Sequence, residues 1–189
     1  MGIRVRIIER GSQISPMSRA LGTQARSLEI LAMVEDGFIE KFLSQGRPLD
    51  NAHLFYGSHL RCQMPFTKGT DSRYERALFM EQERLSKVLV EELEGMGVKV
   101  EFGWELADTQ VVESAEDAHV KTVIRRTVTP EGEERELQVI RSEYLVAADG
   151  GRSTVRHKAN IKFPGRTLVT KTLMFDGTVD TDLELKDIT

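Results

Sequence analysis

Residues 144–156 read YLVAADGGRSTVR, and this pattern decides the expected fold. The apolar run at residues 144–148 predicts a buried strand, after which Asp149 and Gly150 form a turn. Residues 153–158 then predict the start of a helix. A strand that ends at a glycine turn and a helix start presents a fixed carboxylate and backbone N–H groups. This arrangement suits a polyphosphate ligand.

The residues before this stretch predict a series of strands and helices. Residues 2–10 place apolar side chains on one face and predict a short strand. Helices are expected at residues 23–35 and Phe38–Ser44, the first of which stops at an Asp-Gly pair. Residues 47–76 mix aromatics, glycines, prolines and charges, so they predict short strands and loops of a separate lobe. Residues 81–96 carry an apolar stripe at helical spacing and predict a long helix.

More strands are expected around residues 144–156. Residues 98–102 alternate between apolar and polar side chains, which is typical of a strand. An antiparallel meander is expected from three further strands at residues 110–112, His119–Arg126 and 136–140. Residues 167–189 give weaker strand signals. Together these elements predict an α/β fold with a β-rich lobe.

The composition indicates a folded protein without a strong charge preference. Hydrophobic residues make up 40% and charged residues 30% of the 189 residues, which is ordinary for a globular chain. The formal net charge of −4 provides no basic field, so we expect neither nucleic acid nor an anionic membrane as a partner. No apolar stretch approaches the length of a membrane span, and the single cysteine, Cys62, allows no internal disulfide. We therefore expect a cytoplasmic protein.

Several classes of enzyme have no support in the sequence. The four histidines are scattered and form no metal-ligand spacing, so no metal site is expected. They are His53, His59, His119 and His157. The chain contains neither the G-x-S-x-G turn of serine hydrolases nor a Walker loop.

Glu9, at the end of the first predicted strand, is a candidate binding residue. In a dinucleotide-binding βαβ unit, an acid at the end of the second strand accepts hydrogen bonds from ribose hydroxyls. The alternative is that Glu9 and Arg10 form an ordinary solvated strand end. The glycine-rich turn of such a unit lies about 20 residues before this acid, and that position falls before Met1. No G-x-G-x-x-G occurs later, so we expect an incomplete binding unit.

Four stretches of the sequence carry a resemblance to a known family. They are IRVRIIER (residues 3–10), SRALGTQARSLEIL (residues 18–31), QERL (residues 82–85) and YLVAADGGRSTVR (residues 144–156). In these stretches the chain resembles the FAD-dependent aromatic hydroxylases, the group that includes phenol and para-hydroxybenzoate hydroxylase. The resemblance implies a set of residues that contact the cofactor, with Glu9 at the FAD ribose: Glu9, Arg10, Arg19, Arg26, Gln82, Asp149, Gly150 and Arg156.

Each of these assignments has a plainer alternative. Arg19 and Arg26 are otherwise ordinary exposed charges beside a helix, and Gln82 is otherwise a helix-starting residue without a function. Asp149 and Gly150 alone are a routine turn, but the apolar run before them and Arg156 after them favour a binding role.

The resemblance also implies a domain division and an activity. It implies an incomplete FAD/NAD(P)-binding Rossmann-like domain at residues 1–46 and 80–166, part of a substrate lobe at residues 47–79, and the start of substrate-domain strands at residues 167–189. An intact member would reduce FAD with NADPH or NADH and insert one oxygen atom of O2 into an aromatic or similar small substrate. No catalytic side chain is assigned.

Two other functions remain as alternatives. Because both ends of the family pattern are missing, the chain is expected to be a truncated member, and a non-catalytic remnant or interaction module is the rival function. A disulfide-reductase-like flavoprotein is disfavoured, because Cys62 has no second cysteine to form a redox pair. The sequence carries no signal for a particular oligomeric state.

Overall fold

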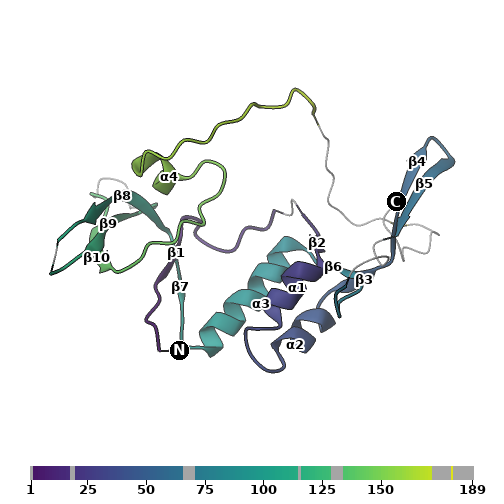
Figure 1. The fold of residues 1–189 in the computed structure, drawn as a ribbon, viewed down its shortest axis with the longest axis horizontal. Coiled ribbons are helices and arrows are strands. Elements are labelled where there is room, and N and C mark those ends of the chain that lie inside the picture. Colours follow the sequence, from purple (N-terminus) through teal and green to yellow (C-terminus); the bar gives the residue numbers. More distant parts are fainter. Residues whose placement is uncertain are drawn as a thin grey trace. The chain divides into compact units, whose positions relative to one another are not determined.

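The computed structural model describes residues 2–17, 20–65, 71–114, 116–128, 134–171 and 180. The chain divides into two compact units, and each is described by itself (Figure 1). The strand unit comprises Met1–Gln13 and Gly97–Thr172, and the helical unit comprises Ile14–Met96 and Leu173–Thr189.

The described residues of the strand unit form two small sheets and a short helix. Strand β1 (Ile7–Glu9) pairs in parallel with β7 (Val100–Phe102). An antiparallel meander is formed by β8 (Trp104–Val112), β9 (His119–Arg126) and β10 (Leu137–Ser142), with β9 in the middle. Helix α4 (Thr154–Lys158) follows the meander.

The meander forms because its middle strand buries alternate residues. Thr122 and Ile124, two positions apart on β9, are both buried, as expected for side chains on one face of a strand. Trp104, at the start of β8, is also buried. Its ring lies beneath the guanidinium of Arg126, whose Cζ is 4.4 Å from the ring centroid. This face is therefore the apolar part of the strand unit.

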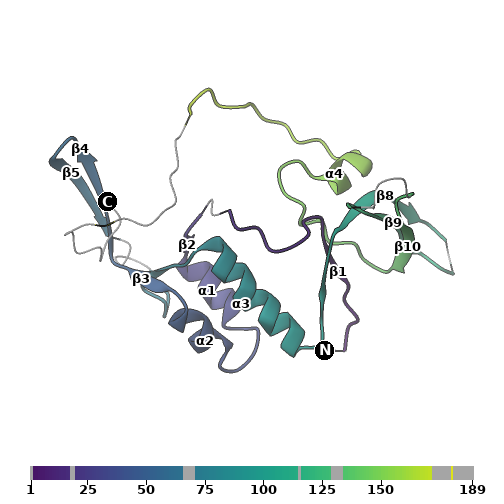
Figure 2. The same ribbon diagram turned by 180° about the vertical axis from the view of Figure 1, so that it is seen from behind.

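In the part that the structure describes, the helical unit combines three helices with two small antiparallel sheets. The helices are α1 (Ala25–Leu31), α2 (Phe38–Ser44) and α3 (Gln82–Gly95). Strand β6 (Ala77–Phe79) lies between β2 (Gly22–Thr23) and β3 (Arg47–Leu49), and β4 (Asn51–Tyr56) pairs with β5 (His59–Pro65). Seen from the front and from behind, α1 lies beside α3, and the β4–β5 hairpin extends away from the helices (Figures 1 and 2).

Apolar side chains from the helices and from β6 form the core of the helical unit. Its buried members are Leu28, Phe38, Ile39, Phe42, Leu78, Met80 and Val88. Leu85 and Leu89 of α3 pack against this cluster, because they lie on the same helix face as Val88. The amphipathic pattern of α3 therefore explains how the helix attaches to its unit.

Most of the predicted elements are confirmed. Helix α2 has the predicted bounds, α3 begins and ends within one residue of the prediction, and α4 forms inside residues 153–158. The predicted α/β class and the meander are also confirmed. Strand β1 and helix α1 are shorter than expected, at three and seven residues.

The buried strand expected at residues 144–148 is wrong. These residues have no regular secondary structure, and Tyr144 and Val146 are 83% and 86% exposed. An apolar run becomes a buried strand only where neighbouring strands accept its backbone hydrogen bonds and cover its side chains. In the part of the chain that the structure describes, the parallel sheet contains only β1 and β7, and neither pairs with this run.

The weaker strand signals at the end of the chain are only partly covered by the structure. Residues 167–171 are exposed and form no strand, and most of residues 172–189 lie outside the described ranges. No helix among the described residues has the length and apolar character needed to cross a membrane.

Candidate functional site

Glu9 lies at the carboxyl end of β1, with its side chain exposed. Because β1 and β7 are parallel, they end at the same edge, where Glu9 is in register with Phe102. The Oε1 of Glu9 accepts a hydrogen bond from the backbone N–H of Gly11 at 2.7 Å. The carboxylate is therefore held against the turn that follows the strand while remaining accessible.

A side chain at position 11 would crowd this turn. A Cβ at Gly11 would lie 3.0 Å from the carbonyl oxygen of Gln13 and 3.3 Å from Oε1 of Glu9. Both distances are tighter than ordinary van der Waals contact, so a side chain would fill the space that the carboxylate uses. An accessible carboxylate at the end of a parallel strand fits the two hydroxyls of a ribose. Arg10, next in the chain, is exposed.

Asp149 caps the N-terminus of α4. Its Oδ2 accepts hydrogen bonds from the backbone N–H groups of Thr154 at 2.6 Å and Val155 at 3.2 Å. The Oγ of Ser153 accepts the N–H of Arg156 at 3.0 Å. The first N–H groups of a helix lack partners within the helix, so these side chains stabilise its first turn. The N–H groups that the sequence suggested for a polyphosphate are thus hydrogen-bonded within the chain.

The pKa of Asp149 lies below its ordinary value. Burial, the largest single influence, acts to raise this pKa, but hydrogen bonds from the Ser153 hydroxyl and from the N–H groups of Val155 and Thr154 together lower it. The carboxyl group is therefore ionised at neutral pH. A negative charge at this position is also favoured by the dipole of α4.

Gly150 and Arg156 complete the turn and the helix start. Gly150 has φ = +78°, a left-handed conformation that favours glycine, and its carbonyl oxygen accepts the N–H of Ser153 at 3.1 Å. The Nη1 of Arg156 donates to the carbonyl oxygen of Gly151 at 3.1 Å, and its guanidinium lies 4.5 Å from the ring centroid of Phe163.

The Nε of Arg156 is buried, and it has no hydrogen-bond partner among the described residues. Buried donors without a partner are uncommon in folded proteins. A phosphate or carbonyl oxygen of a ligand is the kind of acceptor that satisfies a guanidinium N–H. Among the predicted residues around the Asp149–Gly150 turn, Arg156 is therefore the one whose surroundings best fit an anionic ligand.

Gln82 lines a cavity within the helical unit. The cavity has a volume of about 500 Å³ and is lined by β2, the residues before it and the first turns of α3: Ser15, Met17, Ala20, Leu21, Gly22, Thr23, Gln82, Leu85 and Ser86. Hydroxyl and amide groups from the polar members stand beside apolar side chains. Such a mixed lining can hold a small organic ligand and orient it through a few polar contacts.

Of the two arginines predicted in this part of the chain, the structure describes Arg26, which is not among the lining residues. Arg26 is on the surface of α1, where its side chain is 83% exposed and its Nη1 lies 2.9 Å from Oε2 of Glu29. Arg19 lies outside the described residues. The structure thus places Glu9, Arg10, Asp149, Gly150 and Arg156 in the strand unit, and Arg26 and Gln82 in the helical unit.

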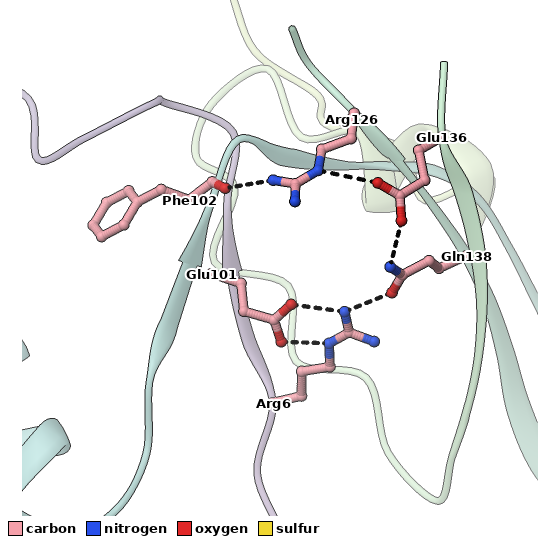
Figure 3. Close-up of polar contacts among 6 residues, drawn as sticks. All are labelled: Arg6, Glu101, Phe102, Arg126, Glu136 and Gln138. Carbon is pink, nitrogen blue, oxygen red and sulfur yellow. Dashed lines mark hydrogen bonds and ion pairs between the residues drawn. The ribbon is translucent and has the colours of Figure 1, made fainter. Parts of the chain in front are cut away.

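The sequence did not indicate a ring of polar contacts next to β1. Figure 3 shows the six residues of this polar ring, which are Arg6, Glu101, Phe102, Arg126, Glu136 and Gln138. No spacing rule connects residues so far apart in the chain. The other cavity-lining residues were also not predicted, although residues 20–23 belong to a stretch already singled out for its resemblance.

These groups offer charges and hydrogen-bonding atoms that a ligand could use. Among the described residues, no three or more His, Cys, Asp or Glu side chains are placed to hold a metal ion together. The strand unit offers an accessible carboxylate at a strand end and a cation with a buried, unpartnered donor. The helical unit offers a cavity of mixed polarity.

Comparison with known proteins places the chain in a family. Residues 1–187 match the family described as FAD binding domain. A relative, 6-methylpretetramide 4-monooxygenase from Streptomyces rimosus, is 32% identical over 186 residues, which are 96% of this chain and 30% of the relative. An uncharacterized aromatic compound monooxygenase from Bacillus subtilis (strain 168), YhjG, is 33% identical over 87% of this chain and 30% of its own length.

Solved structures are also similar over part of their length. The p-nitrophenol 4-monooxygenase PnpA from Pseudomonas putida DLL-E4 matches with a TM-score of 0.72 at 24% identity, over 88% of this chain and 40% of its own. The anhydrotetracycline hydroxylase OxyS from Streptomyces rimosus matches with a TM-score of 0.65 at 29% identity, over 86% of this chain and 30% of its own. The chain thus spans about 30% of the length of the curated relatives that it matches.

Proposed function

We propose that this chain, which belongs to the FAD-binding domain family, forms part of the cofactor-binding region of an FAD-dependent monooxygenase. This monooxygenase would hydroxylate an aromatic or similar small organic substrate with NADPH or NADH and O2. The names of the relatives support this proposal, since both are called monooxygenases. The chain spans about 30% of their length, so the activity of a whole enzyme is itself part of the proposal.

The observation that carries the proposal is the position of Glu9. Its accessible carboxylate lies at the carboxyl end of a parallel strand, and the Gly11 N–H holds it there. In dinucleotide-binding folds an acid at this position accepts hydrogen bonds from ribose hydroxyls. We assign Glu9 to the adenosine ribose of FAD, with Arg10 beside it.

The remaining predicted residues have supporting roles in this proposal. Arg156 fits an anionic or carbonyl oxygen because its Nε is buried without a partner in the described part of the chain. Asp149 and Gly150 hold the start of α4, on which Arg156 lies. Gln82 supplies an amide at the 500 Å³ cavity, and Arg19 and Arg26 remain proposed cofactor contacts. Bound FAD would supply the redox chemistry, while these residues bind and orient it.

The test is FAD binding by the purified chain. Quenching of flavin fluorescence on titration gives the dissociation constant, and the visible spectrum after removal of free FAD shows whether flavin is retained. We expect saturable binding that Glu9→Gln weakens by about tenfold, since a lost hydrogen bond between a charged group and its ligand is worth about 1.5 kcal/mol.

A matched variant separates this effect from a change in net charge. Glu113→Gln makes the same substitution at an exposed residue of the strand unit, and it should bind FAD like the unaltered chain. If the unaltered chain retains no flavin, the non-catalytic interaction module becomes the better description. If Glu9→Gln and Glu113→Gln bind FAD equally well, the role of Glu9 is wrong.

A further inference from the structure

The polar ring joins both strands of the parallel pair to the meander (Figure 3). Arg6 donates two hydrogen bonds to Glu101, from Nε to Oε1 at 2.6 Å and from Nη2 to Oε2 at 2.8 Å. The same Nη2 donates to Oε1 of Gln138 at 2.9 Å. Arg6 immediately precedes β1, Glu101 belongs to β7 and Gln138 belongs to β10. One guanidinium therefore contacts residues of two different sheets.

The other half of the ring connects β7 with β9 and the start of β10. Gln138 Nε2 donates to Glu136 Oε1 at 3.0 Å, and Arg126 Nε donates to Glu136 Oε2 at 3.4 Å. Arg126 Nη1 donates to the carbonyl oxygen of Phe102 at 3.4 Å. Phe102 is the residue in register with Glu9. The ring thus begins three residues before Glu9 and ends at its partner on β7.

Strand β1 needs such support because its own pairing is short. It contributes three residues to a two-stranded parallel pair, and such a small ribbon is marginally stable by itself. A shift of one residue in register would move every side chain of the strand to the opposite face. The residues before β1 do not prevent such a shift by burial, because Ile3 and Val5 are both exposed.

Contacts at both ends of β1 oppose such a shift. Before the strand, the paired hydrogen bonds from Arg6 to Glu101 have a directional geometry that a single ammonium contact lacks. After the strand, the carbonyl oxygen of Gly11 accepts the N–H of Gly103 at 2.8 Å. The contact between Arg6 and Glu101 is made by their side chains, so the register at the amino end of β1 depends on these two residues.

The ion pair is present at neutral pH. The hydrogen bond with Glu101 raises the pKa of Arg6, and the hydrogen bond with Arg6 lowers the pKa of Glu101. Arg126 also lowers the pKa of Glu101 through its charge. The carboxyl groups of Glu101 and Glu136 face two guanidinium groups, so the charges in the ring balance.

We propose that Arg6 is a positioning residue, which fixes the register of β1 through Glu101 and Gln138 and thereby places the Glu9 carboxylate for the FAD ribose. This inference rests on the proposed function of Glu9. It adds that cofactor affinity depends on residues that do not themselves contact the cofactor. Arg6 acts through the backbone of β1, three residues away from the carboxylate.

The experiment is a double-mutant cycle on FAD affinity, measured with the purified 189-residue chain. Arg6→Met should weaken binding about fivefold, the upper range for loss of a partly exposed ion pair. Arg4→Met is the matched control, because Arg4 is an exposed arginine two positions before Arg6 in the segment that precedes β1, and it should change little. In a Glu9→Gln background, Arg6→Met should cause no further loss.

One further measurement needs no bound cofactor, and two further variants separate positioning from general stability. Amide hydrogen exchange of β1 in the FAD-free chain should be faster in Arg6→Met than in Arg4→Met. If Arg6→Met does not fold, Arg6→Lys keeps the charge without the paired geometry and should give a smaller loss. The double variant Arg6→Glu with Glu101→Arg exchanges the two residues and should restore part of the FAD affinity that Arg6→Met loses.

The outcomes separate this inference from the proposed function. If the unaltered chain binds FAD and the effects of Arg6→Met and Glu9→Gln simply add, Arg6 supports the fold without positioning Glu9, and the inference is overturned alone. Unchanged amide exchange of β1 in Arg6→Met would overturn it as well. If the unaltered chain does not bind FAD, the proposed function fails and this inference fails with it.

Discussion

Gly46→Ala should destabilise the helical unit through a steric clash. A Cβ at Gly46 would lie 2.6 Å from Cγ and 2.8 Å from Cδ2 of Leu78, and 2.8 Å from the carbonyl oxygen of Phe79. Ordinary contacts between such atoms begin near 3.4 Å, so the neighbours would have to move by more than half an ångström. Leu78 is buried in the core and Phe79 contributes backbone to β6, so neither can move freely.

The expected size of the effect follows from two opposing contributions. Overpacking of a close-packed core costs about 1–3 kcal/mol. Replacing glycine with alanine restricts the unfolded chain and offsets about 0.4–1 kcal/mol of that loss. The free energy of unfolding should fall by about 1–2 kcal/mol. For a domain of roughly 100 residues, each kcal/mol lowers the unfolding temperature by roughly 4–8 °C.

The assay is thermal and urea unfolding followed by circular dichroism at a helix-sensitive wavelength, since the helical unit contains three of the four described helices. Gly95→Ala is the matched control. A Cβ at Gly95, the last residue of α3, would meet no atom within 4 Å, so this variant should be as stable as the unaltered chain or slightly more stable. If Gly46→Ala and Gly95→Ala unfold at the same temperature, the steric argument is wrong.

Two further predictions concern α4. Asp149→Asn should destabilise the strand unit by at most about 1 kcal/mol at neutral pH, because the ionised carboxylate caps the helix from a largely exposed position. Since folding lowers the pKa of Asp149, its contribution to stability is present above the ordinary carboxyl pKa and is lost as the pH falls through the lowered value. In urea unfolding, the stabilities of Asp149→Asn and the unaltered chain should therefore converge below about pH 4. A constant difference between them down to about pH 2 would contradict this. Lys158→Met should raise the pKa of Asp108, because the hydrogen bond from Lys158 is the main cause of its lowered value. Carboxyl NMR titration measures this change, and an unaltered Asp108 titration would refute it.

The elements that the sequence predicted well depend on local interactions. The apolar stripe of α3 and the glycine after it define a helix through contacts between residues three and four apart. The meander is similar, because β9 has the predicted bounds and its buried residues, Thr122 and Ile124, alternate along the strand as local strand geometry requires. In these segments the local pattern and the tertiary packing agree, so the prediction needed no knowledge of distant residues.

The run at residues 144–148 shows where this reasoning stops. Its apolar composition predicts burial, but burial requires other strands to pair with it, and the described residues supply none. The site shows a similar limit. The sequence identified Asp149 as a fixed carboxylate, whereas only the structure showed that its Oδ2 is used to cap α4.

The sequence by itself therefore determined the α/β class, the main helices, the meander, and the acid at the end of the first strand. It could do so because these features follow from side-chain periodicity and from short motifs. Only the tertiary structure brought Arg6 together with Glu101 and Gln138, and Gln82 together with the cavity before α3. Contacts between residues 95 or more positions apart depend on how the whole chain packs, and no local pattern encodes the distance between two such side chains.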